Sequence, residues 1–142
     1  MTLVERFADY ARAFELTLDD DDWGRLEPYF TETAAYHGGP EIVHGRDAVL
    51  RHLRGSVDSL DRRMDQRTLD FQPFTADGNT VSFDWTVTYA RDGCPDLVVV
   101  GHEVAVFDGD RIAELRDEYT PEMLAAFRSW LKAYGSRLRD PG

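Results

Sequence analysis

The spacing of hydrophobic residues changes along the chain and predicts helices first and strands afterwards. Near the N-terminus apolar residues recur at steps of three and four, which predicts an amphipathic helix of about four turns. Thr2 and Glu5 resemble a capping box at its start. The apolar stripe of this helix consists of Leu3, Phe7, Tyr10, Phe14 and Leu18.

Two further helices are expected before residue 60. A short one turns Trp23, Leu26, Tyr29 and Phe30 inward. Residues 34–37 form a short extended piece that ends at the glycine–proline turn 38–40. Gly45 opens the next helix, whose apolar side carries Val49, Leu50, Leu53 and Val57.

From Arg67 onward the hydrophobic period becomes two, which indicates strands with one solvated face. Turn residues at 77–79 and 91–93 separate these strands, and segments 97–107 and 111–119 complete a four-stranded antiparallel meander. Thr120 and Pro121 then have the residue types that begin a last helix. The clearest alternation is that of Val81, Phe83, Trp85, Val87 and Tyr89.

This order of elements predicts an α+β fold, in which a cone-shaped, curved antiparallel sheet packs against the N-terminal helices. The length of 142 residues suits one domain, so we expect residues 1–142 to form it. The mouth of such a cone is a natural apolar pocket.

Composition narrows the possible partners. The net charge of −11 and the lack of a basic patch argue against nucleic acids and anionic membranes. The one cysteine, Cys94, favours a reducing, cytoplasmic location, and no signal peptide or apolar span of membrane length is evident. No metal-binding or nucleotide-binding motif is present, so we expect no metal and no cofactor.

The hairpin formed by residues 97–119 raises the main chemical question, because ionisable residues share a strand pair with core residues. With a two-residue turn at 109–110, His102 faces Asp117. With a three-residue turn and a bulge at Gly109, Glu103 faces Asp117 instead. Both alternatives keep Asp117 on the inner face with Leu115 and Tyr119, and the pattern leaves both open.

Either pair forms an acid/base unit. A carboxylate beside histidine raises the pKa of the imidazole and orients its ring. Two carboxyl groups in one apolar site push their pKa values apart, so that one stays protonated near neutral pH.

The order of motifs resembles the SnoaL-like family. The matching features are the early helices, Tyr36 with the glycine turn after it, Gly45-Arg46, and the run from Phe107 through Tyr119. That family belongs to the cone-shaped superfamily of nuclear transport factor two, ketosteroid isomerase, scytalone dehydratase and limonene epoxide hydrolase. The resemblance covers about residues 3–120.

The resemblance also implies site residues. Compared with limonene epoxide hydrolase, Tyr36 matches a water-holding tyrosine, and Glu103 and Asp117 resemble its two catalytic aspartates. Gly38 replaces its asparagine, and Gly101 replaces the arginine that bridges the aspartates.

Other members of the superfamily imply further matches. Ketosteroid isomerase has its general base where Gly38 lies, a helix-one tyrosine near Phe14 and its oxyanion-hole acid near Glu103. His102 and Asp117 resemble the late-strand histidine and aspartate of SnoaL-type polyketide cyclases.

We therefore expect a cofactor-independent acid/base enzyme that acts on a small apolar substrate by epoxide opening, cyclisation or isomerisation, in natural-product metabolism. Asp117, with His102 or Glu103, would relay protons, and Tyr36 would donate a hydrogen bond to the oxygen that develops charge. A homodimer is also expected. The alternative is a non-catalytic module of the same fold that binds a small ligand or dimerises. The expected pocket walls are Phe14, Trp23, Trp85, Tyr89, Leu115 and Tyr119.

Overall fold

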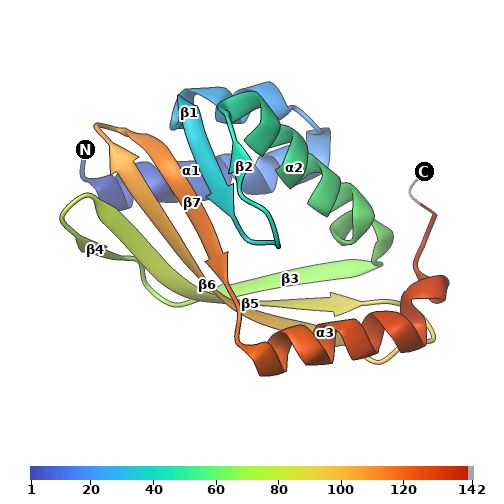
Figure 1. Ribbon diagram of the computed structural model, residues 1–142. Helices are drawn as coiled ribbons and strands as arrows, with labels where there is room; N and C mark the ends of the chain where they lie inside the picture. The colour runs from blue at the N-terminus through green and yellow to red at the C-terminus, as the bar shows by residue number, and fades with distance from the viewer. Residues whose placement is uncertain (141–142) are drawn as a thin grey trace.

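The computed structural model describes residues 1–140 and shows a curved sheet with helices packed against it (Figure 1). Its helices are α1 (Leu3–Asp20), η1 (Trp23–Tyr29), α2 (Arg46–Ser59), η2 (Asp61–Arg63), α3 (Pro121–Tyr134) and η3 (Gly135–Arg137), the η elements being 3-10 helices. Its strands are β1 (Phe30–His37), β2 (Val43–His44), β3 (Gln66–Phe71), β4 (Thr75–Asp77), β5 (Thr80–Ala90), β6 (Leu97–Asp108) and β7 (Arg111–Glu118).

The strands form one sheet in the order β2-β1-β7-β6-β5-β3, with β4 paired to β5. The antiparallel path through β3, β5, β6 and β7 confirms the meander expected from the alternating pattern. The sheet as a whole is mixed, however, because β1 runs parallel to β7 and places Tyr36 beside Leu115. The expected extended piece at 34–37 is thus the end of a full strand, and it brings Tyr36 next to the late hairpin.

The helix ends follow the capping residues in the sequence. The Thr2 hydroxyl accepts a hydrogen bond from the backbone N–H of Glu5 at 3.1 Å, and Thr120 does the same for Met123 at 3.1 Å. Each bond satisfies one of the backbone donors that a helix leaves unpaired in its first turn. None of the helices within residues 1–140 is both long enough and apolar enough to cross a bilayer.

The core consists of two groups of buried residues. The larger group joins α1 and α2 to the sheet and includes Phe7, Leu26, Phe30 and Ile112. The smaller group joins α3 to the far end of β5 and β6, and Trp130 of α3 is buried in it. The Trp130 indole N–H also donates to the Pro95 carbonyl at 3.0 Å, which fixes α3 against the β5–β6 connection.

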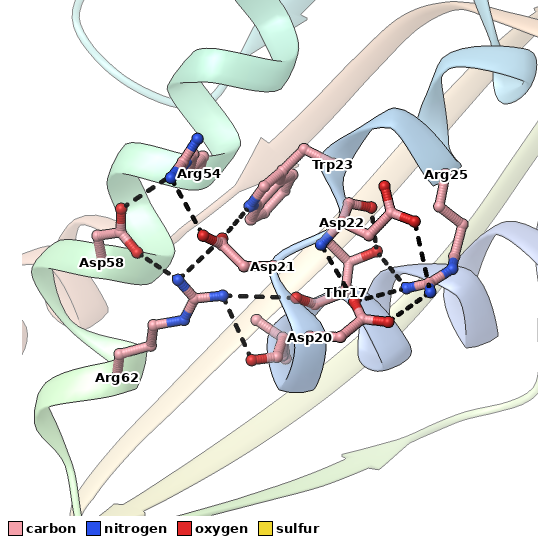
Figure 2. Close-up of polar contacts among 10 residues, drawn as sticks. Thr17, Asp20, Asp21, Asp22, Trp23, Arg25, Arg54, Asp58 and Arg62 are labelled. Carbon is pink, nitrogen blue, oxygen red and sulfur yellow. Dashed lines mark hydrogen bonds and ion pairs between the residues drawn. The ribbon is translucent and has the colours of Figure 1, made fainter.

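The end of α1 is tied to α2 by a polar cluster around Asp21 (Figure 2). Asp21 has a left-handed backbone (φ 61°) and ends the helix. Its carboxylate accepts from the Trp23 indole N–H at 2.6 Å and pairs with Arg62 at 2.9 Å and Arg54 at 3.1 Å. The Trp23 hydrogen bond and, next, the Arg62 hydrogen bond lower the pKa of Asp21.

Arg62, in η2, contacts both α1 and α2. Its guanidinium also bonds Asp58 at 2.8 Å and the carbonyl oxygens of Thr17 and Leu18 at 3.4 and 3.3 Å. Both carbonyls belong to the last turn of α1, where backbone acceptors lack partners within the helix, and the Thr17 carbonyl also accepts from the Asp21 backbone N–H at 2.8 Å. The cluster therefore holds α2 against the end of α1, and both helices contribute walls of the cavity described below.

We predict that Arg62→Ala lowers the free energy of unfolding by about 1–2 kcal/mol, because charged hydrogen bonds are lost from a partly exposed site. Urea unfolding followed by circular dichroism measures this change. Arg51→Ala is the matched control, since Arg51 is an exposed residue of α2. Equal stability of the two variants would contradict the proposed role of Arg62.

Candidate active site

The register of the β6–β7 hairpin decides which ionisable residues enter the fold. The turn contains two residues, Gly109 and Asp110, and Gly109 has a left-handed φ of 64°. Phe107 faces Ile112, as the two-residue alternative predicts. A bulge then leaves Ala113 unpaired, so that Ala105 faces Leu115 and Glu103 faces Asp117. The hairpin thus combines the short turn of one alternative with the facing pair of the other.

His102 points away from the inner face, so of the two alternatives left open by the sequence, the one that pairs His102 with Asp117 is wrong. It lies opposite Glu118, and its Nδ1 is 2.8 Å from Asp84 Oδ1. Asp84 is exposed on β5, between the inward-facing Phe83 and Trp85. Because neighbouring side chains of a strand alternate between faces, only one of His102 and Glu103 can be inside. Glu103 shares the inner face of β6 with Ala105 and Phe107, and the bulge in β7 brings Asp117 to that face.

A cavity of about 280 Å³ lies between the two core groups. Its wall includes eight of the ten site residues expected from the sequence, namely Tyr36, Glu103, Asp117, Phe14, Trp85, Tyr89, Leu115 and Tyr119. His102 and Trp23 do not contribute to the wall. The Trp23 ring packs edge-on against Phe14 with centroids 6.0 Å apart, and its N–H is used by Asp21, so it supports the wall from behind.

Glu103 and Asp117 form an acidic pair in this cavity. Within residues 1–140 neither carboxyl group makes a salt bridge. Burial raises the pKa of Glu103 well above its usual value, and the negative charge of Asp117 raises it further. Glu103 is therefore a carboxylic acid that stays protonated beyond the normal range for glutamate, and it faces a carboxylate.

Tyr36, which comes from β1, forms a hydrogen bond with one member of this acidic pair. Its hydroxyl donates to Asp117 Oδ2 at 2.5 Å, whereas Asp117 Oδ1 is buried and has no hydrogen-bond partner within residues 1–140. Burial, followed by the charge of Asp117, raises the pKa of Tyr36, so the hydroxyl remains a donor. Because this donor is used by Asp117, Tyr36 holds the carboxylate rather than presenting a free O–H to the cavity.

Two glycines make room for aromatic rings at the site. A Cβ on Gly38 would collide with the Tyr36 hydroxyl, and a Cβ on Gly101 would collide with the six-membered ring of Trp85. The Trp85 ring in turn meets Tyr119 edge-on, with centroids 5.9 Å apart. These are the two positions at which the resemblance implied an asparagine and an arginine, and here each glycine allows an aromatic side chain to lie over the backbone.

Sequence reasoning missed several residues of the wall. His52 was not among the expected site residues, but the centroid of its ring lies 5.0 Å from that of Tyr36. Tyr10 is buried, and its raised pKa arises from burial first and then from Glu103 and Asp117. Arg67 could have been found, because it shares the parity of Leu69 on the same strand. Two acidic residues of the wall, Glu15 and Asp61, were also missed.

The facing carboxyl groups of Glu103 and Asp117 can move protons by themselves. A protonated carboxyl and a carboxylate offer one donor and one acceptor to a bound molecule, and the mostly apolar wall strengthens both interactions by excluding water. Within residues 1–140, no three histidine, cysteine or acidic side chains are grouped as metal ligands.

We predict that Gly101→Ala destabilises the protein by about 1–3 kcal/mol, because the new methyl group must displace the Trp85 ring in a packed wall. Chemical unfolding gives the stability, and a changed tryptophan emission reports the ring. Gly55→Ala is the control. Gly55 lies inside α2 with open space around it, so alanine should stabilise the protein by about 0.5–1 kcal/mol. A neutral effect of Gly101→Ala would show that the ring does not need this glycine.

Solved structures with the same fold are numerous, and three illustrate the match. Bal32a, from a soil-derived mobile gene cassette, is 18% identical with a TM-score of 0.67, and the alignment covers 91% of this chain and 98% of that one. TerC, co-crystallised with polyporic acid, is 10% identical with a TM-score of 0.66 and coverages of 89% and 98%. A candidate polyketide cyclase, protein SMa1630 from Sinorhizobium meliloti, is 17% identical with a TM-score of 0.61 and coverages of 78% and 94%.

These identities establish a common fold and nothing finer. A comparison with curated proteins gives no match. The sequence profile of the SnoaL-like domain matches residues 10–115, which include Tyr36, both glycines and Glu103. The match extends over most of the chain and agrees with the curved sheet and the cavity in it. The chain therefore belongs to the SnoaL-like domain family.

Proposed function

We propose that this SnoaL-like protein is a cofactor-independent enzyme that rearranges a small, largely apolar molecule by acid/base chemistry. The observation that carries the proposal is the pair formed by Glu103 and Asp117, two carboxyl groups that face each other in a cavity without a salt-bridging cation. Buried acidic groups are costly for stability, and the raised pKa of Glu103 supplies a proton donor beside a second carboxyl group, as proton transfer between two substrate atoms requires.

In this mechanism Asp117 is the general base and Glu103 the general acid. Asp117 takes a proton from one atom of the substrate while the protonated Glu103 gives a proton to another, so the substrate keeps its overall charge. A proton then passes between the two facing carboxyl groups and restores the starting state. Tyr36 acts as a positioning residue, since its hydrogen bond to Asp117 Oδ2 fixes the orientation of the base.

The reactions that fit are epoxide opening, cyclisation and isomerisation, of the kind that occur in natural-product metabolism. Each needs a proton donor and a proton acceptor near the reacting centre, and none needs an external oxidant. The aromatic wall formed by Phe14, Trp85, Tyr89 and Tyr119 suits an unsaturated or ring-containing skeleton. The structural likeness to a protein co-crystallised with polyporic acid and to a candidate polyketide cyclase is consistent with substrates of this type.

We predict that Asp117→Asn lowers kcat/KM by about 100-fold or more, because the amide cannot accept the proton. The measurement is turnover of a panel of uncharged aryl epoxides and enones, followed by chromatography. Asp84→Asn is the matched control, since Asp84 is an exposed aspartate on the opposite face of the sheet and should leave turnover unchanged. Full activity of Asp117→Asn would show that Asp117 is not the general base. Binding of panel members by the wild-type protein without any turnover would instead favour a ligand-binding module.

Glu103 also gives a prediction for stability against pH. Its pKa is raised in the folded state, so the folded protein binds more protons than the unfolded chain above the ordinary glutamate value of about 4.3. The free energy of unfolding should therefore fall as pH rises above the ordinary glutamate value, with a contribution from Glu103 of up to about 1.4 kcal/mol per pH unit. Glu103→Gln should flatten this slope.

Urea unfolding at a series of pH values measures the effect. Glu41→Gln serves as the control, because Glu41 is exposed in the connection between β1 and β2 and should leave the slope unchanged. A slope for Glu103→Gln as steep as that of the wild-type protein would mean that Glu103 ionises normally in the fold.

A further inference from the structure

A second polar cluster lies in the wall of the same cavity. Arg67 Nε donates to Asp61 Oδ2 at 2.8 Å, and Arg67 Nη1 donates to Glu15 Oε1 at 2.6 Å. The Tyr89 hydroxyl donates to the same Asp61 oxygen at 2.9 Å. These four residues come from α1, η2, β3 and β5, and we call them the Arg67 cluster.

The Arg67 cluster and the acidic pair are separated along β5. Glu103 lies opposite Phe83, and Arg67 lies opposite Tyr89, six residues further along the same strand. Six residues of strand span about 20 Å between Cα atoms, before the side chains reach inward. Between the acidic pair and the Arg67 cluster, the cavity wall is formed by side chains that are largely apolar. These are Trp85 and Val87 of β5 and Leu69 of β3.

Both clusters contain a tyrosine that donates to an aspartate, but their charges differ. At one end of the cavity, Asp117 accepts from Tyr36 and faces Glu103, and no cation within residues 1–140 forms a salt bridge with it. At the other end, Asp61 accepts from Tyr89 and forms a salt bridge with Arg67. A guanidinium stays charged at all relevant pH values and does not exchange protons with a ligand. Burial raises the pKa of Asp61, and the charge of Arg67 acts against that rise. The Arg67 cluster is thus suited to binding rather than to proton transfer.

The cluster has hydrogen-bonding capacity left for a ligand. Arg67 uses Nε and Nη1 for its carboxylates, and within residues 1–140 no partner is found for Nη2. The oxygen of Tyr89 donates its only proton to Asp61 and can still accept one. One donor and one acceptor side by side match a hydroxyl group, and the donor alone matches a carbonyl oxygen.

The charges of the cavity indicate which ligands it excludes. Its wall carries four acidic residues, Glu15, Asp61, Glu103 and Asp117, against the single arginine. Arg67 is already paired with two of them, so an anionic ligand would meet net negative charge at both ends. An uncharged oxygen avoids this repulsion.

We propose that the Arg67 cluster recognises a neutral hydroxyl or carbonyl oxygen at the end of the substrate that does not react. The substrate class is then an elongated, uncharged, apolar molecule with an oxygen function at each end, one at the Arg67 cluster and one at Glu103 and Asp117. That the reaction takes place at Glu103 and Asp117 rests on the proposed function. Recognition at the Arg67 cluster does not depend on it.

Direct binding of simple probes tests the proposal without turnover. Para,para′-biphenol carries a hydroxyl at each end, para-phenylphenol carries one, and both are uncharged at pH 7. Calorimetry should show that wild-type protein binds the diphenol roughly tenfold more tightly than the monophenol, because a hydrogen bond to a charged donor is added. Arg67→Lys keeps the charge but loses the fork of the guanidinium, so the ratio should fall to near one.

The matched control is Arg25→Lys. Arg25 also pairs with two acidic residues, Asp20 and Asp22, but lies outside the cavity wall, so the ratio should stay at the wild-type value. Circular dichroism checks that each variant folds. If Arg67→Lys does not fold, Asp61→Leu combined with Arg67→Met replaces the ion pair by apolar groups of similar size and should give the same loss of the ratio.

Three results would overturn the proposal. The first is a diphenol-to-monophenol ratio that Arg67→Lys leaves unchanged, and the second is equal binding of the two probes by wild-type protein. The third is tighter binding of a probe in which one hydroxyl is replaced by a carboxylate or an ammonium group. A failure of the acid/base assignment would appear separately, as activity retained by Asp117→Asn while the binding ratio still depends on Arg67.

Discussion

The chemistry of the site depends on one pairing, that of Glu103 with Asp117 across the β6–β7 hairpin. The turn at Gly109 and Asp110 alone would place His102 opposite Asp117, and the unpaired Ala113 changes this by one position. A shift of one residue exchanges the two faces of a strand, so the bulge in β7 brings Leu115 and Asp117 to the face of Glu103, while His102 lies on the outer face beside Asp84. A single backbone irregularity thus converts a possible imidazole–carboxylate pair into a pair of carboxyl groups.

That pairing is unfavourable by itself and is stabilised by its surroundings. Desolvation and the facing charge both oppose ionisation of Glu103, so the favourable state is one proton shared between two carboxyl groups. Tyr36 stabilises the ionised partner by its hydrogen bond, and it can do so because β1 lies parallel to β7. The parallel strand is therefore part of the site, since it supplies the group that orients Asp117.

The sequence was sufficient for the fold class and for eight residues of the cavity wall. Helical spacing before residue 60 and alternation after residue 67 gave the elements, and Asp117 was inside in either register because it shares parity with Leu115. The choice between His102 and Glu103 could not be made, because a bulge at Ala113 leaves no mark in the hydrophobic pattern. The parallel pairing of β1 was equally hidden, since it joins residues about 80 positions apart without a local turn signal.

The two glycines explain why this member of the family can carry an uncompensated acidic pair. The resemblance to limonene epoxide hydrolase implied an arginine at position 101, between the two acids, and such a cation would hold both of them ionised. Gly101 instead allows the Trp85 ring to cover the backbone there, and an aromatic ring adds desolvation where a guanidinium would add charge. The arginine of this cavity is Arg67, six positions along the sheet, where it faces Asp61 and Glu15. In the proposed function, this separation leaves proton transfer to Glu103 and Asp117 and gives the far end of the cavity a fixed charge for recognition of the substrate.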